Sequence, residues 1–571
     1  MTPGGPLREP SRSDRRAAGL RLALVLLLLG LGLAVAIDLT PWREQVARRS
    51  LDAGAFGSRD MTRILSALGA LHPRPSLRAP GESFEPPDLD PAYSLDPLPV
   101  EQITATFGID PERVASGVPS VALLVAPDDL AELEANPEER GRAWERPAYF
   151  AFVEAGRVLD ASLVGVRIHG GGGRRKGRYG FRLYFRRRYG DPWLAAEVLD
   201  TGGMRPPKRV VLRRDGGRGR GRQPWHFVNA IGHDIARRIG LAAAHSRPVA
   251  FYLNGRYRGV VALVERIDRH YLLAHYGHDD FVQVDTKFSR FDPTPQVKLG
   301  DEQQYGALVA WATAREPLSL DEVRRRVDLE NFVRWGWLMQ ILATGDFRQG
   351  ALLLDRSDPK ARWFTIPWDL DISLGIWGGR SDLAAVNRFP DWLIPRLWRR
   401  DVRTAVVGRL LTDSDSFRTL YTTELDEILN HRLTDEWIGA LVDGYRQEAQ
   451  RFGIDDAFLD FVHRFLRRRP DVLRQQLHEH LDFGPSHEVR VVAPQGVRIR
   501  VGGRLYERPF HGRYVEGSLL RLEIDPAVRH LFGAWLYSRR EIAEPGVEIP
   551  VEGPLEVRLL TDRSIERGEA T

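Results

Sequence analysis

The alternation of apolar and polar residues predicts that the first half of the folded chain is rich in β-strands. The folded part is expected to begin near Ser120, where the run Val121–Val125 predicts a strand and Asp128-Asp129 predicts the start of a helix. Asn254-Gly255, which joins two apolar stretches, predicts a tight hairpin. The other strands of this half are predicted within residues 149–170, 180–188, 210–212 and 248–268.

Helical spacing dominates after residue 268. One helix, Trp225–Ile239, is predicted before that point and ends at Gly240. Apolar residues at helical spacing then predict helices within residues 328–342, 401–431 and 434–482. Between these helices, Ala351–Asp355 and Trp363–Pro367 predict a short hairpin. From His487 onward, short apolar runs predict a separate small β domain.

The stretch Trp363–Gly375 carries two carboxylates, Asp369 and Asp371, one residue apart. On an extended segment both side chains would point to the same side. Mg²⁺ prefers such oxygen ligands, but a strand end that caps a turn accounts for the same spacing. Asp346 lies in a loop before the hairpin. Protein kinases place their base and their metal carboxylate in this order, with the base on a loop.

A glycine-rich turn, His169–Gly173, joins two of the predicted strands and is followed by several cations. Glycines allow backbone amides to approach a phosphate, and cations supply the opposite charge. The binding residues expected here are Gly170, Gly171, Gly172, Lys176 and Arg178. A plain turn remains the alternative. A lipase-like reading of the turn fails, because no G-x-S-x-G nucleophile motif occurs in the chain.

The composition of the chain excludes several kinds of chemistry and indicates possible partners. The 571 residues suggest two to four domains, and the absence of cysteine excludes disulfides, thiolate metal sites and a cysteine nucleophile. The net charge is +5, and the chain contains five lysines, so almost all of its basic residues are arginines. Residues 167–222 hold seventeen arginines and lysines. This block predicts a solvated basic face, a funnel for nucleotide phosphates, or a contact with anionic lipid or envelope polymer, and no nucleic-acid partner is expected.

The N-terminus predicts export. Five arginines precede the uncharged run Leu22–Ile37, so the following chain is expected outside the inner membrane. A retained transmembrane anchor is favoured, and a signal peptide cleaved near Ala34-Val35-Ala36 is the alternative. Residues 38–117 are rich in proline and charge, which predicts a stalk with one helix over Ser58–Leu71.

The chain resembles the CotH family of spore-coat-type, atypical secreted protein kinases over roughly residues 118–400. The resemblance rests on Leu253–Asp268, which follows the family pattern L-N-G-x-Y-x-G with a later E-x-x-D, and on Pro367–Gly375, which follows P-W-D-x-D-x-x-x-G. His169–Phe185 matches the family's glycine turn and basic strand in shape more than in identity.

The resemblance implies a degenerate kinase fold that binds ATP with Mg²⁺ or Mn²⁺ and phosphorylates protein hydroxyls. It makes Asp346 the base-like catalytic residue, Asp369 and Asp371 the metal residues, and Glu265 a residue of the inter-lobe connection near the adenine. Two departures stand out. The family's phosphate-gripping lysine falls on Arg178, with Lys176 as a substitute, and a metal-binding asparagine falls on Ala351.

The expected fold class is therefore α+β, with a kinase-like domain of two lobes. The expected parts are a basic tail (1–21), an anchor or signal peptide (22–37), a stalk (38–117), a β-rich N-lobe (118–268), a helical C-lobe (269–484) and a C-terminal β domain (485–571). The expected function is transfer of the ATP γ-phosphate to serine or threonine hydroxyls of envelope proteins. The alternatives are an inactive pseudokinase that binds an envelope partner, and a nucleotidyl transferase on the same fold.

Overall fold

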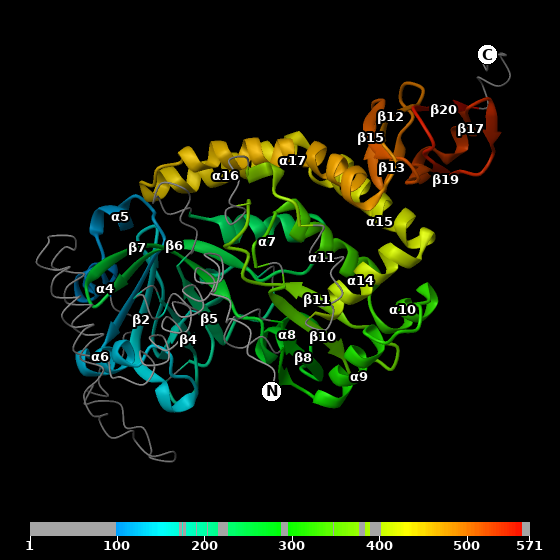
Figure 1. Ribbon diagram of the computed structural model, residues 1–571. Coiled ribbons are helices and arrows are strands. Elements are labelled where there is room, and N and C mark those ends of the chain that lie inside the picture. The colour runs from blue at the N-terminus through cyan, green and yellow to red at the C-terminus, as the bar shows by residue number, and fades with distance from the viewer. Residues whose placement is uncertain are drawn as a thin grey trace, which may run out of the picture. The chain divides into compact units, whose positions relative to one another are not determined.

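The computed structural model describes most of the chain from residue 99 onward. The described residues are 99–170, 174, 177, 179–189, 191–201, 204–214, 226–286, 295–346, 348–375, 383–388 and 401–561. The chain divides into two compact units, residues 1–83 with 130–143 and residues 84–129 with 144–571. The described part of the first unit is 130–143, which contains most of helix α6 (Pro127–Ala135) and the start of the 3-10 helix η1 (Arg142–Trp144). The second unit contains the elements discussed below (Figure 1).

The predictions for the basic tail, the run Leu22–Ile37 and the helix Ser58–Leu71 lie outside the described residues. Among the helices that are described, none has the length and apolarity needed to cross a bilayer. The predicted stalk extends too far at its C-terminal end, because helices α4 (Val100–Phe107) and α5 (Pro111–Ala115) are folded. Ile103 and Phe107 are fully buried against strands of the N-terminal barrel, as their spacing on one helical face allows.

Seven strands form this barrel, in the order β1-β2-β3-β4-β5-β7-β6, and the parallel pair β1 and β6 closes it. The predicted hairpin at Asn254-Gly255 is confirmed, with φ values of 49° and 71° that suit a tight β-turn. The Asn254 side chain also bonds the backbone nitrogen and oxygen of Val125, at 2.8 and 2.9 Å. The strands are β1 (Ser120–Val125), β2 (Arg146–Glu154), β3 (Arg157–His169), β4 (Gly180–Tyr184), β5 (Arg209–Arg213), β6 (Ser246–Leu253) and β7 (Arg256–Glu265). A 3-10 helix, η3 (Ala196–Val198), lies between β4 and β5.

A second sheet of four strands follows the barrel, in the order β11-β10-β8-β9. The hairpin of β10 (Gly350–Asp355) and β11 (Phe364–Pro367) was predicted, whereas β8 (Phe281–Asp285) and β9 (Gln296–Leu299) were not. Strands of five and four residues carry little periodicity, and they lie in a region where helical spacing dominates. The helices around this sheet are α8 (Arg269–Tyr276), α9 (Glu302–Ala312) and α10 (Leu320–Arg326).

The predicted helices pack into one large hydrophobic core. Helix α7 (Val228–Arg238) contributes one apolar face, and Gly240 follows it at a φ of 89°. Helix α11 (Leu329–Ile341) is buried almost throughout, including Trp335 and Trp337. The remaining elements of this region are η4 (Leu383–Ala385), α14 (Val402–Asp413), α15 (Asp415–Glu427), the π-helical turn η5 (Ile428–Arg432), α16 (Asp435–Phe452) and α17 (Ala457–Leu481).

The C-terminal residues form two sheets around their own hydrophobic core. Their strand orders are β15-β12-β20-β17-β18 and β14-β13-β16-β19. His431 of η5 joins them to the helices through hydrogen bonds to the Tyr506 and Tyr514 hydroxyls, at 2.7 and 2.9 Å. The elements are β12 (Ser486–Val492), β13 (Ile499–Val501), β14 (Arg504–Tyr506), β15 (Phe510–Val515), β16 (Leu519–Ile524), η6 (Pro526–Leu531), β17 (Phe532–Tyr537), β18 (Arg540–Ile542), β19 (Gly546–Pro550) and β20 (Leu555–Thr561).

The structure confirms the mixed α+β class. It places a barrel before a region dominated by helices and a pair of β sheets at the C-terminal end. The interpretation of the first two parts as the lobes of a protein kinase stays a prediction.

Candidate functional site: a carboxylate cluster beside an arginine

The loop that follows α11 is fastened to the turn that follows β11. The Gly345 amide donates to the Ile372 carbonyl at 2.7 Å, and the Leu374 amide donates to the Leu342 carbonyl at 2.6 Å. A third bond joins the hydroxyls of Thr344 and Ser373 at 3.1 Å. These contacts bring Asp346 close to the segment that carries Asp369 and Asp371.

The sequence left two readings of the D-x-D motif, an extended segment and a turn at the end of a strand, and the structure shows the turn. Strand β11 ends at Pro367, and Asp369 has a left-handed φ of 66°, so the chain turns at the motif. The turn is held on α7, because the buried side chain of Asn229 accepts a hydrogen bond from the Leu370 amide at 2.9 Å. Gly232 of the same helix lies against Leu370, where a Cβ atom would come within 2.9 Å of the Leu370 side chain. The turn therefore brings the carboxylates of Asp369 and Asp371 to the same side, which the sequence analysis expected from the alternation of an extended strand.

Arg213 at the end of β5 contacts both motif carboxylates. Its Nη2 atom lies 3.0 Å from an Asp371 oxygen and also donates a hydrogen bond to Asp369. The arginine is 8% exposed, so it is held close to the carboxylates with little competing water. Sequence analysis missed this residue. The adjacent pair Arg213-Arg214 at the end of a predicted strand was the available signal, but nothing local connects it to a motif 156 residues away.

The surroundings of Asp346 favour its protonated form. Burial and then the negative charge of Asp371 raise the pKa of Asp346, against a hydrogen bond from Gln349 and the positive charges of Arg213 and Arg388. The Nε2 atom of the Gln349 side chain donates to the Asp346 carboxylate at 2.9 Å and fixes its orientation. A raised pKa makes this carboxylate a better proton acceptor than an ordinary aspartate.

The glycine-rich turn is described only in part. Gly170 follows β3 at a φ of 141°, a backbone conformation that glycine adopts readily. Gly171, Gly172, Lys176 and Arg178 lie outside the described residues. Their predicted contacts with phosphate therefore stay predictions.

Glu265, predicted to lie near an adenine, ends β7 and is 1% exposed. Its carboxylate lies 2.9 Å from Nε2 of His275 and accepts a longer bond from the His245 amide at 3.4 Å. The residue does lie where the barrel leads into α8 and the second sheet. Sequence analysis did not anticipate its histidine partners. Ala351, at the family's asparagine position, is buried in an apolar cluster.

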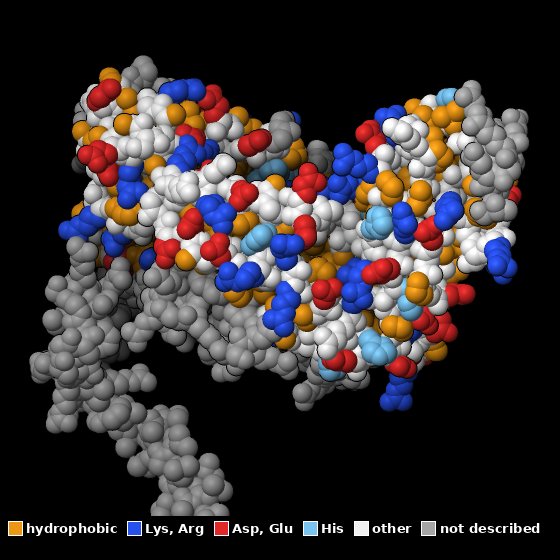
Figure 2. Space-filling view, turned by 90° about the horizontal axis from the view of Figure 1, so that it is seen from above, with side chains coloured by type: hydrophobic (Ala, Val, Ile, Leu, Met, Phe, Trp, Pro, Cys, Tyr) orange, Lys and Arg blue, Asp and Glu red, His pale blue; other side chains and the backbone are white. Residues whose placement is uncertain are grey.

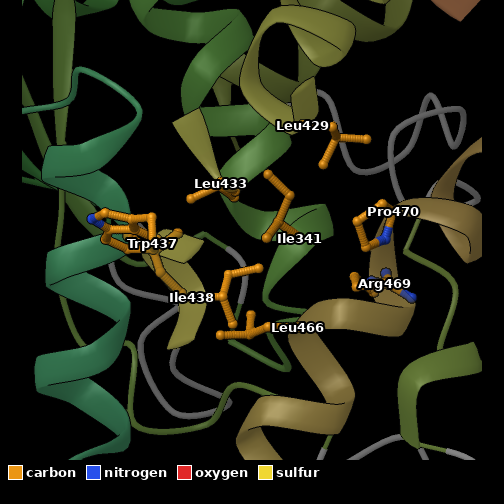
Figure 3. Close-up of a pocket in the computed structure, with 9 residues that line it drawn as sticks. Ile341, Leu429, Leu433, Trp437, Ile438, Leu466, Arg469 and Pro470 are labelled. Carbon is orange, nitrogen blue, oxygen red and sulfur yellow. The ribbon is translucent and has the colours of Figure 1, made fainter. Parts of the chain in front are cut away.

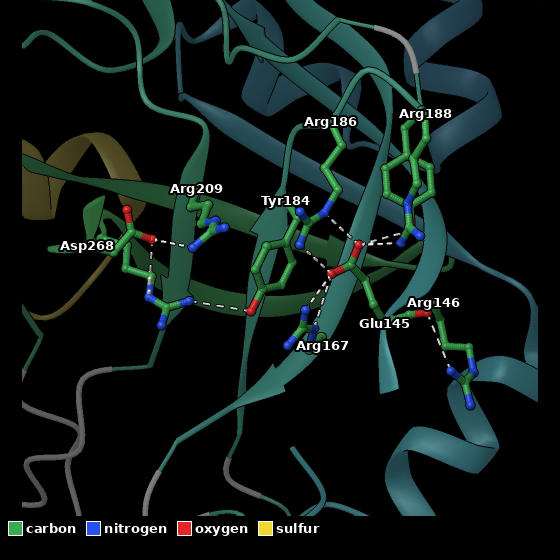
Figure 4. A network of polar contacts seen from close by, with 10 residues as sticks. Glu145, Arg146, Arg167, Tyr184, Arg186, Arg188, Arg209 and Asp268 are labelled. Atoms are coloured by element: carbon green, nitrogen blue, oxygen red, sulfur yellow. Dashed lines mark hydrogen bonds and ion pairs between the residues drawn. The ribbon is translucent and has the colours of Figure 1, made fainter. Parts of the chain in front are cut away.

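Several arginines of the basic block pair with carboxylates within the barrel (Figure 4). Glu145, whose side chain is fully buried, forms salt bridges with Arg167, Arg186 and Arg188 at 2.7, 2.9 and 2.6 Å. Burial alone would raise the pKa of Glu145, but the hydrogen bonds and charges of Arg186 and Arg167 outweigh it and lower the pKa. Part of the predicted basic face is thus neutralised internally.

Charges are also mixed elsewhere on the surface. Figure 2 shows lysine and arginine side chains interspersed with aspartate and glutamate over the described part of one face. A cavity between α7, α11, η5, α16 and α17 is lined mostly by apolar side chains and has a volume of about 10 Å³, close to the smallest that admits one water (Figure 3). It is too small for a nucleotide.

The comparison with protein families identifies the family of the chain. The family described as CotH kinase protein matches residues 166–457, which is more than half of the chain. The matched range contains Gly170, Glu265 and the carboxylate cluster. The chain belongs to the CotH family. A search of curated proteins finds no match.

Proposed function

We propose that this protein is an extracytoplasmic CotH-type protein kinase, which transfers the γ-phosphate of ATP to serine or threonine hydroxyls of envelope proteins. The observation that carries the proposal is the convergence of Asp346, Asp369 and Asp371 around Arg213. Phosphoryl transfer needs a cation held by carboxylates and a further carboxylate that orients the acceptor hydroxyl. The three aspartates offer that combination in one small region.

The donor set of the cluster fits a hard divalent cation. Asp369 and Asp371 would hold Mg²⁺ or Mn²⁺, and their shared contact with the Arg213 guanidinium shows that both already face a positive charge. The cation, when bound, supplies neutralisation of phosphate charge. Asp346 is placed on the adjoining loop and accepts the hydrogen bond of an acceptor hydroxyl.

Arg213 has a further part in this proposal. Its guanidinium contacts Oδ1 of Asp369 and Oδ1 of Asp371, so a cation that used these same oxygens would displace it from at least one of them. A released guanidinium next to these carboxylates is well suited to bind phosphate oxygens, since arginine donates in a planar fork. The same residue would then exchange a carboxylate partner for a phosphate partner as nucleotide binds.

The inactive binding protein is the second candidate, and two observations favour it. Ala351 offers no oxygen ligand and is buried in an apolar cluster. Arg213 already neutralises part of the D-x-D charge. In this alternative the protein holds a phosphorylated or polyanionic envelope partner. For both candidates we propose attachment to the membrane through residues 22–37 and contact with anionic lipid or polymer through the basic block of residues 167–222.

The test uses the full chain in detergent with Mg²⁺ or Mn²⁺, ATP labelled separately at the α- and γ-phosphates, and a pool of serine- and threonine-containing peptides. We expect label from the γ-phosphate alone, one phosphate of mass per event, and a loss on the order of 100-fold or more in Asp369→Asn, as for other groups that stabilise transition-state charge. Asp358→Asn is the matched control, because the Asp358 side chain is exposed and accepts a hydrogen bond from the Lys360 amide of its own turn.

Other outcomes decide between the candidates. Label from the α-phosphate would replace the kinase with a nucleotidyl transferase. Absence of both labels, together with no thermal shift by ATP and metal, would refute catalysis. Retained binding of a polyanionic partner by Asp369→Asn would then support the binding protein.

A further inference from the structure

Two histidines and a glutamate converge where the barrel leads into α8. His245 precedes β6, Glu265 ends β7 and His275 lies in the last turn of α8. One ligand atom from each residue lies within 4.8 Å of the others. The three residues come from separate elements, so the barrel and the helix together create the cluster.

The cluster is held in place before any ligand binds. The Glu265 amide donates to the His245 carbonyl at 2.8 Å, which fixes the distance between these two residues through the backbone. The His275 ring stacks on Tyr271 at 3.7 Å between centroids, and its Nε2 atom lies 2.9 Å from Glu265. The two imidazole centroids are 5.7 Å apart. The ligand atoms are close enough together for one ion to contact all three residues.

The donor types favour a borderline-soft transition metal over Mg²⁺. Two imidazoles and one carboxylate form the His₂Glu set that binds Zn²⁺ in proteins, with the fourth position left to water. A neutral imidazole presents a lone pair to the metal.

We propose that His245, Glu265 and His275 form a Zn²⁺ site that fastens α8 to the ends of the barrel strands β6 and β7. The site is separate in residues and in donor chemistry from the carboxylate cluster, so it does not depend on the proposed kinase activity. Its occupation would assign Glu265 to the metal and not to the adenine of a nucleotide. The metal would stabilise the connection between the barrel and the second sheet.

The test titrates the chelator-stripped full chain, in detergent, with Zn²⁺ and separately with Co²⁺, whose visible absorption reports coordination geometry. We expect one Zn²⁺ per chain, a rise in the unfolding temperature on binding, and a tetrahedral Co²⁺ spectrum. His245→Ala and His275→Ala are each expected to weaken binding at least tenfold, as losses around zinc sites do. His245 is half-buried in a loop, so its replacement serves if His275→Ala fails to fold.

Two controls make the result specific. His487→Ala removes another histidine that pairs with a glutamate, at 3.0 Å from Glu516, and is expected to leave zinc binding unchanged. Asp369→Asn is likewise expected to retain the full zinc stoichiometry. The proposal is overturned if stoichiometric zinc is not bound, if both histidine variants bind zinc like the parent chain, or if Asp369→Asn alone abolishes binding.

Discussion

Two clusters of charged side chains in this protein, one around Glu145 and one around Arg213, have opposite balances of charge. Around Glu145, three arginines surround one buried carboxylate, and the pKa of that carboxylate is lowered. Around Arg213, three aspartates gather, and the pKa of Asp346 is raised. Among the described groups, the first centre has an excess of positive charge. The second has an excess of negative charge, even when Arg388, whose charge also acts on Asp346, is counted with Arg213. The charges of the first centre are paired within the fold, whereas the second centre is where we propose that a cation binds.

The largest effect should follow from breaking the first centre. Glu145→Gln leaves three partly buried arginines without their shared counter-charge, so we expect a loss of about 3 kcal/mol in stability, at the lower end for broken buried pairs because the arginines are partly exposed. Thermal and urea unfolding of the full chain measure this loss. Glu197→Gln is the control, because Glu197 pairs with Arg157 at an exposed position and should contribute less than about 1 kcal/mol. Equal effects of the two substitutions would contradict the structural role of Glu145.

The second centre should gain metal affinity when its arginine is removed. Arg213→Gln removes the group that shares the oxygens of Asp369 and Asp371, so we expect Mn²⁺ to bind roughly tenfold more tightly without nucleotide, since a hydrogen bond to a charged group contributes about 1.5 kcal/mol. Calorimetric titration measures the affinity. Arg209→Gln is the control, because Arg209 pairs with Asp268 at 2.8 Å. Unchanged or weaker Mn²⁺ binding in Arg213→Gln would show that the arginine does not compete with the cation.

The smallest predicted effect concerns the pH dependence of stability, which should have opposite signs for Glu145 and Asp346. Glu145 has a folded pKa below its ordinary value of 4.5, so its contribution to stability is present above that pH and is lost as the pH falls through the folded pKa. Asp346 has a folded pKa above its ordinary value of 3.8, so its ionisation destabilises the fold as the pH rises from there through the folded pKa. The stability deficit of Glu145→Gln should therefore shrink in acid.

Asp346→Asn should behave in the opposite way. It removes an ionisation that costs stability, so its unfolding temperature relative to the parent chain should rise between acid and neutral pH. Unfolding midpoints of the parent chain, both variants and Asp358→Asn across this range make the comparison. Parallel pH profiles for Glu145→Gln and Asp346→Asn would remove the electrostatic contrast between the two centres.

Local signals explain what the sequence predicted well. Asn254-Gly255 specifies its own hairpin, and the apolar spacing of α11 specifies a buried helix. Asp346, Asp369 and Asp371 were candidates because a loop and a short hairpin place them near each other along the chain. A turn at the end of the strand was one of the two readings of the D-x-D motif, but the left-handed backbone of Asp369 was not predicted, because it depends on contacts with α7.

Most features that the sequence did not predict depend on contacts between residues far apart along the chain. Arg213 and the D-x-D motif are far apart in the sequence and contact each other only through the tertiary structure. His245 and His275 flank Glu265 in space but are twenty and ten residues away in sequence, with no motif to join them. Strands β8 and β9 are too short for their alternation to stand out from the helical pattern around them.

The closed barrel limits how a partner can be recognised. Its seven described strands pair with neighbours on both sides, so their backbone offers no free edge to which an incoming peptide could add a strand. By contrast, β9 and β11 form the two edges of the second sheet, and β15, β18, β14 and β19 form the edges of the C-terminal sheets. Among the strands that the structure describes, these edges are the places where an extended polypeptide could dock by strand addition. On the barrel, discrimination between partners falls to side chains and loops.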